Sequence, residues 1–134
     1  RVSAGSLRAT ISNLRQYGTG SVRDLQAITE ESGRRAQATA KRLAPRDSGY
    51  MASKLQLVLS AKRLAWRIGY DEADFLGRGL AFYPVFQELG FRHWITGEFI
   101  QNPHIRPAHR LEASRYTADV AAALRRRALA MRVR

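Results

Sequence analysis

Residues 83–111, YPVFQELGFRHWITGEFIQNPHIRPAHRL, form the stretch from which the fold prediction starts. Three of the four prolines lie in it, and its first, apolar part contains a single acid, Glu88. The pattern of residues 81–89 fits either a third strand or a helix with Pro84 in its first turn, and periodicity alone does not decide between them. Residues 91–102 mix charged and aromatic side chains and predict a long loop, which we name the flap.

The sequence after the flap predicts a long C-terminal helix. Pro107 suits the first position of a helix, where its missing N–H is no loss, so we expect a helix over residues 107–130. Apolar side chains recur along one side of this helix and predict its inward face. The residues expected to face inward are Ala113, Tyr116, Val120, Leu124 and Ala128.

Before residue 83, the sequence predicts two helices and a β-hairpin. A short helix over residues 3–17 is interrupted by Gly18 and Gly20, and a second helix follows over residues 22–43. The apolar stripe of the second helix turns small, which permits close approach of another backbone; it consists of Val22, Leu25, Ile28 or Thr29, Ser32, Ala36, Ala40 and Leu43. After a turn in which Gly49 can take positive φ, alternating apolar residues predict paired strands at 55–60 and 64–70. Residues 71–79 predict an exposed loop.

Together these elements predict an α+β fold, with a small, mainly antiparallel sheet packed against a long N-terminal helix and a C-terminal helix. A chain of 134 residues fits a single domain, 1–134, and no internal repeat or low-complexity linker divides it. Within it we expect an N-terminal helix or arm over residues 1–20, a core over 21–130 and a basic tail over 131–134.

The charge is strongly positive, with 23 basic and 11 acidic residues and a formal net charge of +12. This balance suggests a polyanionic neighbour: nucleic acid, an anionic membrane face or an acidic protein. The alternative is that the arginines only solvate helix faces. No apolar run approaches the roughly 18 residues that a membrane span needs, so we expect no membrane partner.

The side chains needed for catalysis or metal binding are sparse. There is no cysteine, and the spacing of His93, His104 and His109 matches no zinc pattern. The GRG at residues 77–79 lacks the lysine and the strand-to-helix context of a phosphate loop, and no GxSxG nucleophile elbow occurs. We therefore expect no enzyme activity, no cofactor and no metal.

Glu88 has two interpretations. It is either a buried carboxylate, held by arginine or backbone donors at a subunit contact, or an outward residue of an edge strand. The sequence leaves both open. Trp94 and Phe99 likewise fit either exposed contact residues or core residues.

Four motifs follow one another along residues 21–130. They are Ala44, Pro45, Ser48, Gly49 and Tyr50 after the long helix, the Ile-Gly-Tyr at residues 68–70, then Tyr83, Glu88 and Gly90, and finally Pro103, Ile105, Arg106, Pro107 and Ala108 at the entry to the last helix. In this order and spacing the chain resembles the tail-completion family of long-tailed phages. Its members are also described as head–tail joining or minor tail-component proteins and occur in prophages and gene transfer agents. Pro84, Leu89 and the long flap depart from the family pattern.

The resemblance implies a structural, non-enzymatic virion protein of the neck or tail end, assembled in the host cytoplasm. It implies a ring of six copies that completes the tail and joins it to the head connector. The implied partners are head connector or adaptor proteins, tail tube or tail terminator proteins, and DNA in passing. The contact between copies in such a ring is heterologous. The residues expected at the subunit interface are Tyr83, Glu88, Gly90, Pro103, Arg106 and Pro107.

The alternative function is a nucleic-acid-binding module. After Asp119, the last helix and tail contain five arginines and no acid, and these arginines could neutralise phosphates. The residues expected to face DNA are Arg125, Arg126, Arg127, Arg132 and Arg134. A ring would arrange them around passing DNA, so the two functions are compatible.

Overall fold

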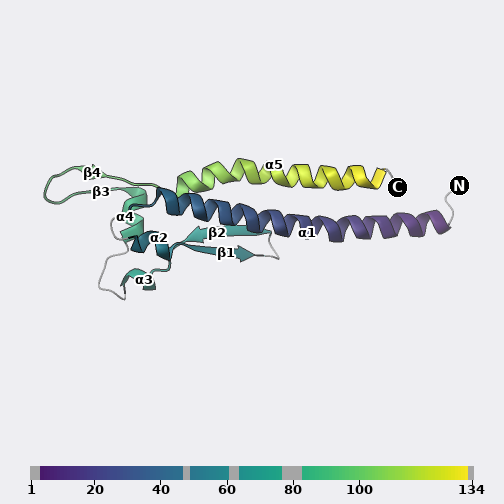
Figure 1. The fold of residues 1–134 in the computed structure, drawn as a ribbon, viewed down its shortest axis with the longest axis horizontal. Coiled ribbons are helices and arrows are strands. Elements are labelled where there is room, and N and C mark those ends of the chain that lie inside the picture. The colour runs from purple at the N-terminus through teal and green to yellow at the C-terminus, as the bar shows by residue number, and fades with distance from the viewer. Residues whose placement is uncertain (1–3, 47–48, 61–63, 77–82, 133–134) are drawn as a thin grey trace.

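The structure, a computed structural model, describes residues 4–46, 49–60, 64–76 and 83–132, with side chains placed for residues 8–131 of these ranges. Its elements are α1 (Ala4–Leu43), α2 (Tyr50–Lys54), β1 (Gln56–Ser60), β2 (Ala65–Gly69), α3 (Ala73–Leu76), α4 (Tyr83–Leu89), β3 (Phe91–Arg92), β4 (Phe99–Ile100) and α5 (Ile105–Arg132). The molecule is elongated, with α5 antiparallel to α1 and the β1–β2 hairpin along the other side of α1 in this view (Figure 1). Helices α2, α3 and α4 gather at one end, and β3 and β4 project beyond them (Figure 1). The predicted α+β class is confirmed.

Helix α1 is continuous over 40 residues, so the predicted break at Gly18 and Gly20 is wrong. A glycine inside a helix costs only about 1 kcal/mol relative to alanine, which tertiary contacts readily offset. At Gly20 a Cβ would lie 2.4 Å from an Arg127 guanidinium nitrogen, because Arg127 crosses from α5 at this point. Its Nε atom donates to Asp24 at 2.7 Å. Gly20 therefore allows close contact between the two helices.

The core is a narrow strip of small side chains on α1. Ser32, Ala36 and Ala40 are fully buried, as the predicted stripe requires. The prediction is wrong for the two end residues of that stripe, Val22 and Leu43, which are exposed. The apolar cluster packed on the strip adds Leu55, Ile68 and Ala108, with Leu57, Trp66, Tyr70 and Ile105 at its edge. Because alanine and serine are short, both the hairpin and α5 approach the α1 backbone closely.

Strands β1 and β2 form the predicted antiparallel hairpin, with Leu57 opposite Ile68 and Leu59 opposite Trp66. The connecting turn, residues 61–63, lies outside the described residues. The indole N–H of Trp66 donates to the Ser32 hydroxyl at 3.0 Å. The hairpin is thus fixed to α1 by a polar contact as well as by burial.

A second small core lies beyond the C-terminal end of α1. Phe75 is buried in it, and the rings of Tyr50 and Tyr70 stand edge-on to Phe75 at centroid distances of 5.7 Å. The prediction of an exposed loop over residues 71–79 is wrong for α3, which inserts Phe75, and residues 77–79 are outside the described ranges. Gly49 has the predicted positive φ, 71°.

Polar side chains join α5 to α1. The buried carboxylate of Glu112 accepts hydrogen bonds from the Ser32 hydroxyl at 3.0 Å and from Nε and Nη2 of Arg35 at 2.9 and 2.6 Å. Arg35 also pairs with Asp119 at 3.0 Å. The pKa of Arg35 is raised, mainly because its guanidinium donates hydrogen bonds to Glu112. A buried carboxylate is tolerated only with such partners, so this contact sets the register of the two helices.

The inward face of α5 differs from the prediction. The helix begins at Ile105, two residues earlier than predicted, and its buried residues are Ala108, Glu112 and Ala123. Of the residues predicted to face inward, Ala128 is exposed, and the half-buried ones are Ala113, Tyr116, Val120 and Leu124. The face is displaced because charged positions on α5 find partners on α1.

Gly33 and Gly18 offer a matched test of the packing of α1. At Gly18 a Cβ meets nothing within 4 Å, so Gly18→Ala should raise the free energy of unfolding by about 0.5–1 kcal/mol. At Gly33 a Cβ would lie 2.8 Å from the Leu57 side chain and 3.0 Å from Trp66 Cβ, so Gly33→Ala should lower it by about 1–3 kcal/mol. Urea denaturation followed by circular dichroism measures both. Equal effects of the two substitutions would contradict the close packing.

Candidate functional site

The segment around Glu88 is helix α4, so the helix alternative is correct and the strand alternative is wrong. Pro84 is the second residue of α4, where its missing N–H breaks no helical hydrogen bond. Gly90 ends the helix with a left-handed φ of 90°, and its N–H donates to the Phe86 carbonyl at 2.8 Å. A Cβ at Gly90 would lie 2.2 Å from the Phe99 ring, so glycine also lets the flap return over this point.

The Glu88 carboxylate caps the N-terminus of α5. Its Oε2 atom accepts the backbone N–H groups of His104 and Ile105 at 2.9 and 3.1 Å, and its Oε1 atom accepts that of Arg106 at 2.8 Å. The next residue, Pro107, has no N–H, and Ala108 begins the helical pattern by donating to the His104 carbonyl at 3.3 Å. Every backbone donor of the first turn is thereby satisfied. Glu88 is thus a buried carboxylate held by backbone donors of its own chain, and the subunit contact that this interpretation also placed here stays a prediction.

The ionisation of Glu88 follows from this geometry. Burial opposes the charged form and would by itself raise the pKa. The three backbone hydrogen bonds to the carboxylate outweigh burial, so the pKa of Glu88 is lowered from its ordinary value of 4.5. The positive end of the α5 dipole acts in the same direction. Glu88 is therefore a carboxylate at neutral pH.

The chain just before α5 is fastened to α4 by further hydrogen bonds. Asn102 donates its backbone N–H to the Gln87 carbonyl at 2.8 Å and its side-chain amide to Gln87 Oε1 at 2.7 Å. The His104 ring is fully buried between the Tyr70 hydroxyl, 2.7 Å from Nε2, and the Asn102 carbonyl, 3.0 Å from Nδ1. Burial raises the pKa of Tyr70, and the negative charge of Glu88 adds to this. Tyr70 therefore keeps its proton, and β2, α4 and α5 are joined in one network.

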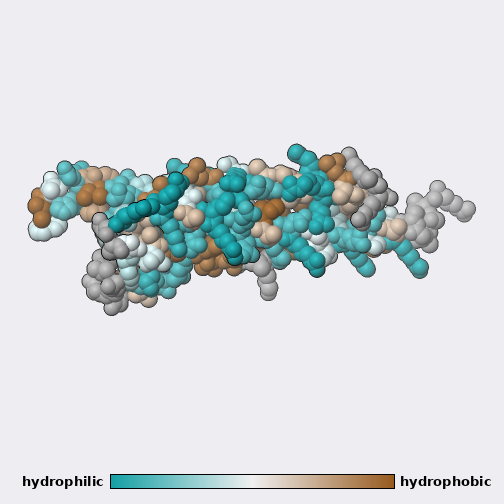
Figure 2. Space-filling view, viewed as in Figure 1, coloured by the Kyte–Doolittle hydropathy of each residue, from teal (hydrophilic) through white to brown (hydrophobic). Residues whose placement is uncertain are grey.

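The flap is a hairpin, so the prediction of an irregular loop over residues 91–102 is wrong for its base. Strands β3 and β4 pair Phe91 with Ile100 and Arg92 with Phe99, and Gly97 turns the chain with a φ of 71°. The tip exposes 88% of Trp94 and 69% of Ile95. Figure 2 shows this hydrophobic tip at the end of a mainly hydrophilic molecule.

The six residues predicted at the subunit interface lie together around the junction of α4 and α5. The exposed ones are Tyr83, Pro103 and Arg106, and the half-buried ones are Gly90 and Pro107. Glu88 is 9% exposed, and its carboxylate is fully used within the chain. The sequence missed His104 and Gln87 as members of this network, because the sequence alone does not show whether a polar side chain is hydrogen-bonded within its own chain.

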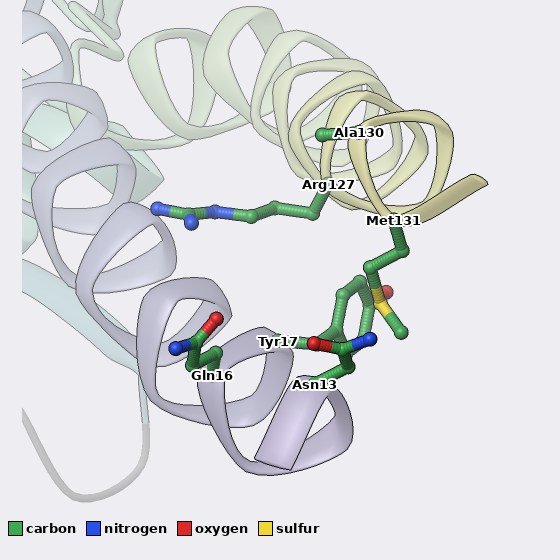
Figure 3. A pocket seen from close by; sticks show the side chains of 6 residues that line it. All are labelled: Asn13, Gln16, Tyr17, Arg127, Ala130 and Met131. Carbon is green, nitrogen blue, oxygen red and sulfur yellow. The ribbon is translucent and has the colours of Figure 1, made fainter. Parts of the chain in front are cut away.

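The five arginines predicted to face DNA do not share one environment. Arg125 and Arg126 are exposed, whereas Arg127 forms an ion pair with Asp24 and lowers the pKa of that acid. Figure 3 shows the Arg127 side chain extending from α5 towards α1. It borders a cavity of about 100 Å³ lined by Asn13, Gln16, Tyr17, Arg127, Ala130 and Met131. Arg132 is described only by its backbone, and Arg134 lies outside the described residues.

Comparison with known proteins adds no further assignment. No family model matches the chain, and no curated protein sequence or solved structure matches it significantly. Within the described ranges, no three His, Asp or Glu side chains come together as a metal site would require. No helix in the described part of the chain is long and apolar enough to cross a membrane. The candidate site is therefore defined by its own geometry, as a capped helix junction that carries an apolar flap.

Substitution of Glu88 tests the helix cap. Glu88→Ala should lower the free energy of unfolding by about 1–3 kcal/mol at pH 7, and Glu88→Gln by less, because an amide oxygen still accepts one or two of the bonds. Because the folded-state pKa is lowered, the wild-type contribution is complete above pH 4.5 and is lost as the pH falls through the lowered pKa. Glu88→Gln should lack this acid dependence.

The control is Glu31→Gln, whose side chain is 71% exposed in its pair with Arg35. It should change stability by no more than about 0.5 kcal/mol. Thermal unfolding between pH 3 and pH 7, followed by circular dichroism, compares the three variants with the wild type. Identical acid profiles for wild type and Glu88→Gln would exclude the cap as described.

Proposed function

We propose that the protein is a structural, non-enzymatic component of the neck or tail end of a long-tailed phage particle, prophage or gene transfer agent. It forms a ring of six copies that completes the tail and joins it to the head connector. Its partners are further copies of itself, head connector or adaptor proteins, and tail tube or tail terminator proteins. Assembly takes place in the host cytoplasm and ends in the virion.

The observation that carries this proposal is the projecting flap. A two-stranded hairpin is at best marginally stable without support, and this one places Trp94 and Ile95 in solvent. An exposed apolar patch of this kind marks a protein contact. An arm that extends beyond the body suits a protein whose stable state is an assembly.

The arrangement of the four sequence motifs also supports the proposal. Tyr50 and Tyr70 both pack on Phe75, and Tyr70 bonds to His104. Glu88 in turn caps the helix that begins after His104. Segments of all four motifs therefore meet at one end of the molecule, next to the base of the flap. Motifs scattered over the surface would have argued against a common purpose.

Purified particles from the strain that encodes the chain test this function. We expect about six copies per particle by quantitative mass spectrometry, and density for the chain at the neck or tail end by cryo-electron microscopy. Deletion of the gene should leave heads and tails that fail to join, or tails that are incomplete. A variant lacking only the Trp94 side chain, Trp94→Ala, should fold normally and complement the deletion poorly, whereas Leu14→Ala, exposed at the opposite end of α1, should complement fully. Absence of the chain from particles would reject the proposal.

A second candidate function, contact with nucleic acid, is favoured by the exposed arginines of α5. Both acids of this helix, Glu112 and Asp119, are used by Arg35. Five exposed arginines on α5 form no ion pair within 4 Å of an acid in the described part of the chain: Arg106, Arg110, Arg115, Arg125 and Arg126. We propose that Arg115, Arg125 and Arg126 contact DNA passing through the ring, which is compatible with the structural role.

Salt dependence tests DNA contact. The logarithm of the affinity for duplex DNA should fall with the logarithm of salt concentration by about 0.9 per phosphate contact. Replacing Arg125 and Arg126 by alanine should reduce this slope by about two. Arg34→Ala, which removes an arginine paired with Glu30 on α1, should leave the slope unchanged. A weak, salt-independent affinity measured by fluorescence anisotropy would contradict this candidate.

A further inference from the structure

A groove lies between β2 and the first turns of α5. It has a volume of about 430 Å³, within the range of sites that hold small ligands or single side chains. Trp66, Ile68 and Ile105 give it an apolar lining, and the His109 ring lies against Trp66 with a centroid distance of 5.6 Å. It is a preformed, partly aromatic surface.

Three arginines border this groove: Arg67 from β2, and Arg106 and Arg110 from α5. All three are exposed, and none forms an ion pair with an acid in the described ranges. No acid lines the groove. Its occupant should therefore be apolar or aromatic at the centre and should carry negative charge at its edge.

The tip of the flap of the same chain supplies both features, while Arg92 at its base donates to the Gly97 carbonyl at 3.1 Å. Trp94 and Ile95 are the most exposed large apolar side chains among the described residues, and Glu98 is exposed three residues further on. Glu98 forms no ion pair with any described residue. An indole beside guanidinium groups adds cation–π attraction to burial.

We propose that the flap of one copy docks in the groove of a second copy. Trp94 and Ile95 occupy the apolar lining, and Glu98 faces the three arginines. The flap projects away from the body beyond α4, so it does not reach the groove of its own chain (Figure 1). Donor and acceptor are different surfaces, which makes the contact heterologous and leads to a closed ring or an open chain. This inference rests on the proposed function and specifies how the ring is held together.

Engineered cysteines report the contact directly, since the chain has no native cysteine. Thr96→Cys places a thiol at the flap tip, and Arg110→Cys places one at the groove. When the two single variants are mixed at high concentration under mild oxidation, we expect a disulfide-linked dimer. The control is Arg126→Cys, another exposed arginine on α5, about 24 Å further along the helix. It should give little or no linked product with Thr96→Cys.

Charge reversal tests the same contact without covalent trapping. Glu98→Arg and Arg110→Glu should each weaken self-association by about tenfold in sedimentation velocity, and the two variants mixed with each other should regain part of the loss. Trp94→Ala should weaken it by about tenfold or more, while Leu129→Ala, also exposed, should not. All four positions are exposed, so the monomers should unfold at wild-type temperature.

The outcomes separate this inference from the proposed function. Flap docking would be overturned if oligomers form but the cysteines at positions 96 and 110 do not link. It would also be overturned if the cysteine at position 96 links equally well to a cysteine at position 126. If the neck ring is seen in particles without that link, the proposed function stands and only the contact fails. If the link forms in pure protein while the chain is absent from particles, the contact stands and the function fails. Docking would also be overturned if the protein neither self-associates nor forms the disulfide link, at any concentration and in particles.

Discussion

The hydroxyl group of Ser32 joins the three main parts of the molecule. It accepts the Trp66 indole N–H from β2 and donates to the Glu112 carboxylate on α5, both at 3.0 Å. Both bonds meet at this one side chain of α1, and the contact needs a short side chain because position 32 is fully buried. Arg35 completes it by neutralising Glu112. Because a buried carboxylate without partners costs several kcal/mol, a one-residue slip of any of these elements would be strongly disfavoured.

Fixing the helices by polar contacts changes the surface that remains. The α1–α5 contact contains little large apolar surface, so its specificity comes mainly from hydrogen bonds and ion pairs. The acids of α5 are consumed at this contact, and its exposed arginines are left without partners in the described part of the chain. Large apolar side chains such as Trp94, Ile95 and Phe99 remain on the flap. These internal bonds leave exposed arginines on α5, and the flap separately presents exposed apolar side chains.

The sequence predicted the regular elements better than their contacts. The helices at both ends, the β1–β2 hairpin and the small stripe of α1 follow from periodicity, which reports the burial of side chains along one element. Gly20 was misjudged because its role depends on Arg127, more than a hundred residues away. Glu112 was missed for a related reason: a charged side chain signals an exposed face unless its partner is known. Glu88 could be isolated as unusual, but its three backbone donors became visible only with the fold.

Glu88 now has a positional role that differs from a direct subunit contact. Its carboxylate binds the N-terminus of α5, and the first two turns of this helix carry Arg106 and Arg110 at the groove. Its own helix, α4, ends at Gly90, where the flap begins. One buried side chain therefore holds the base of the flap against the helix that forms one wall of the groove. If copies join by flap and groove, the angle between the docking arm and the docking surface depends on this cap. A ring closes only when that angle has a particular value, so an internal helix cap can determine whether the assembly is a ring or an open chain.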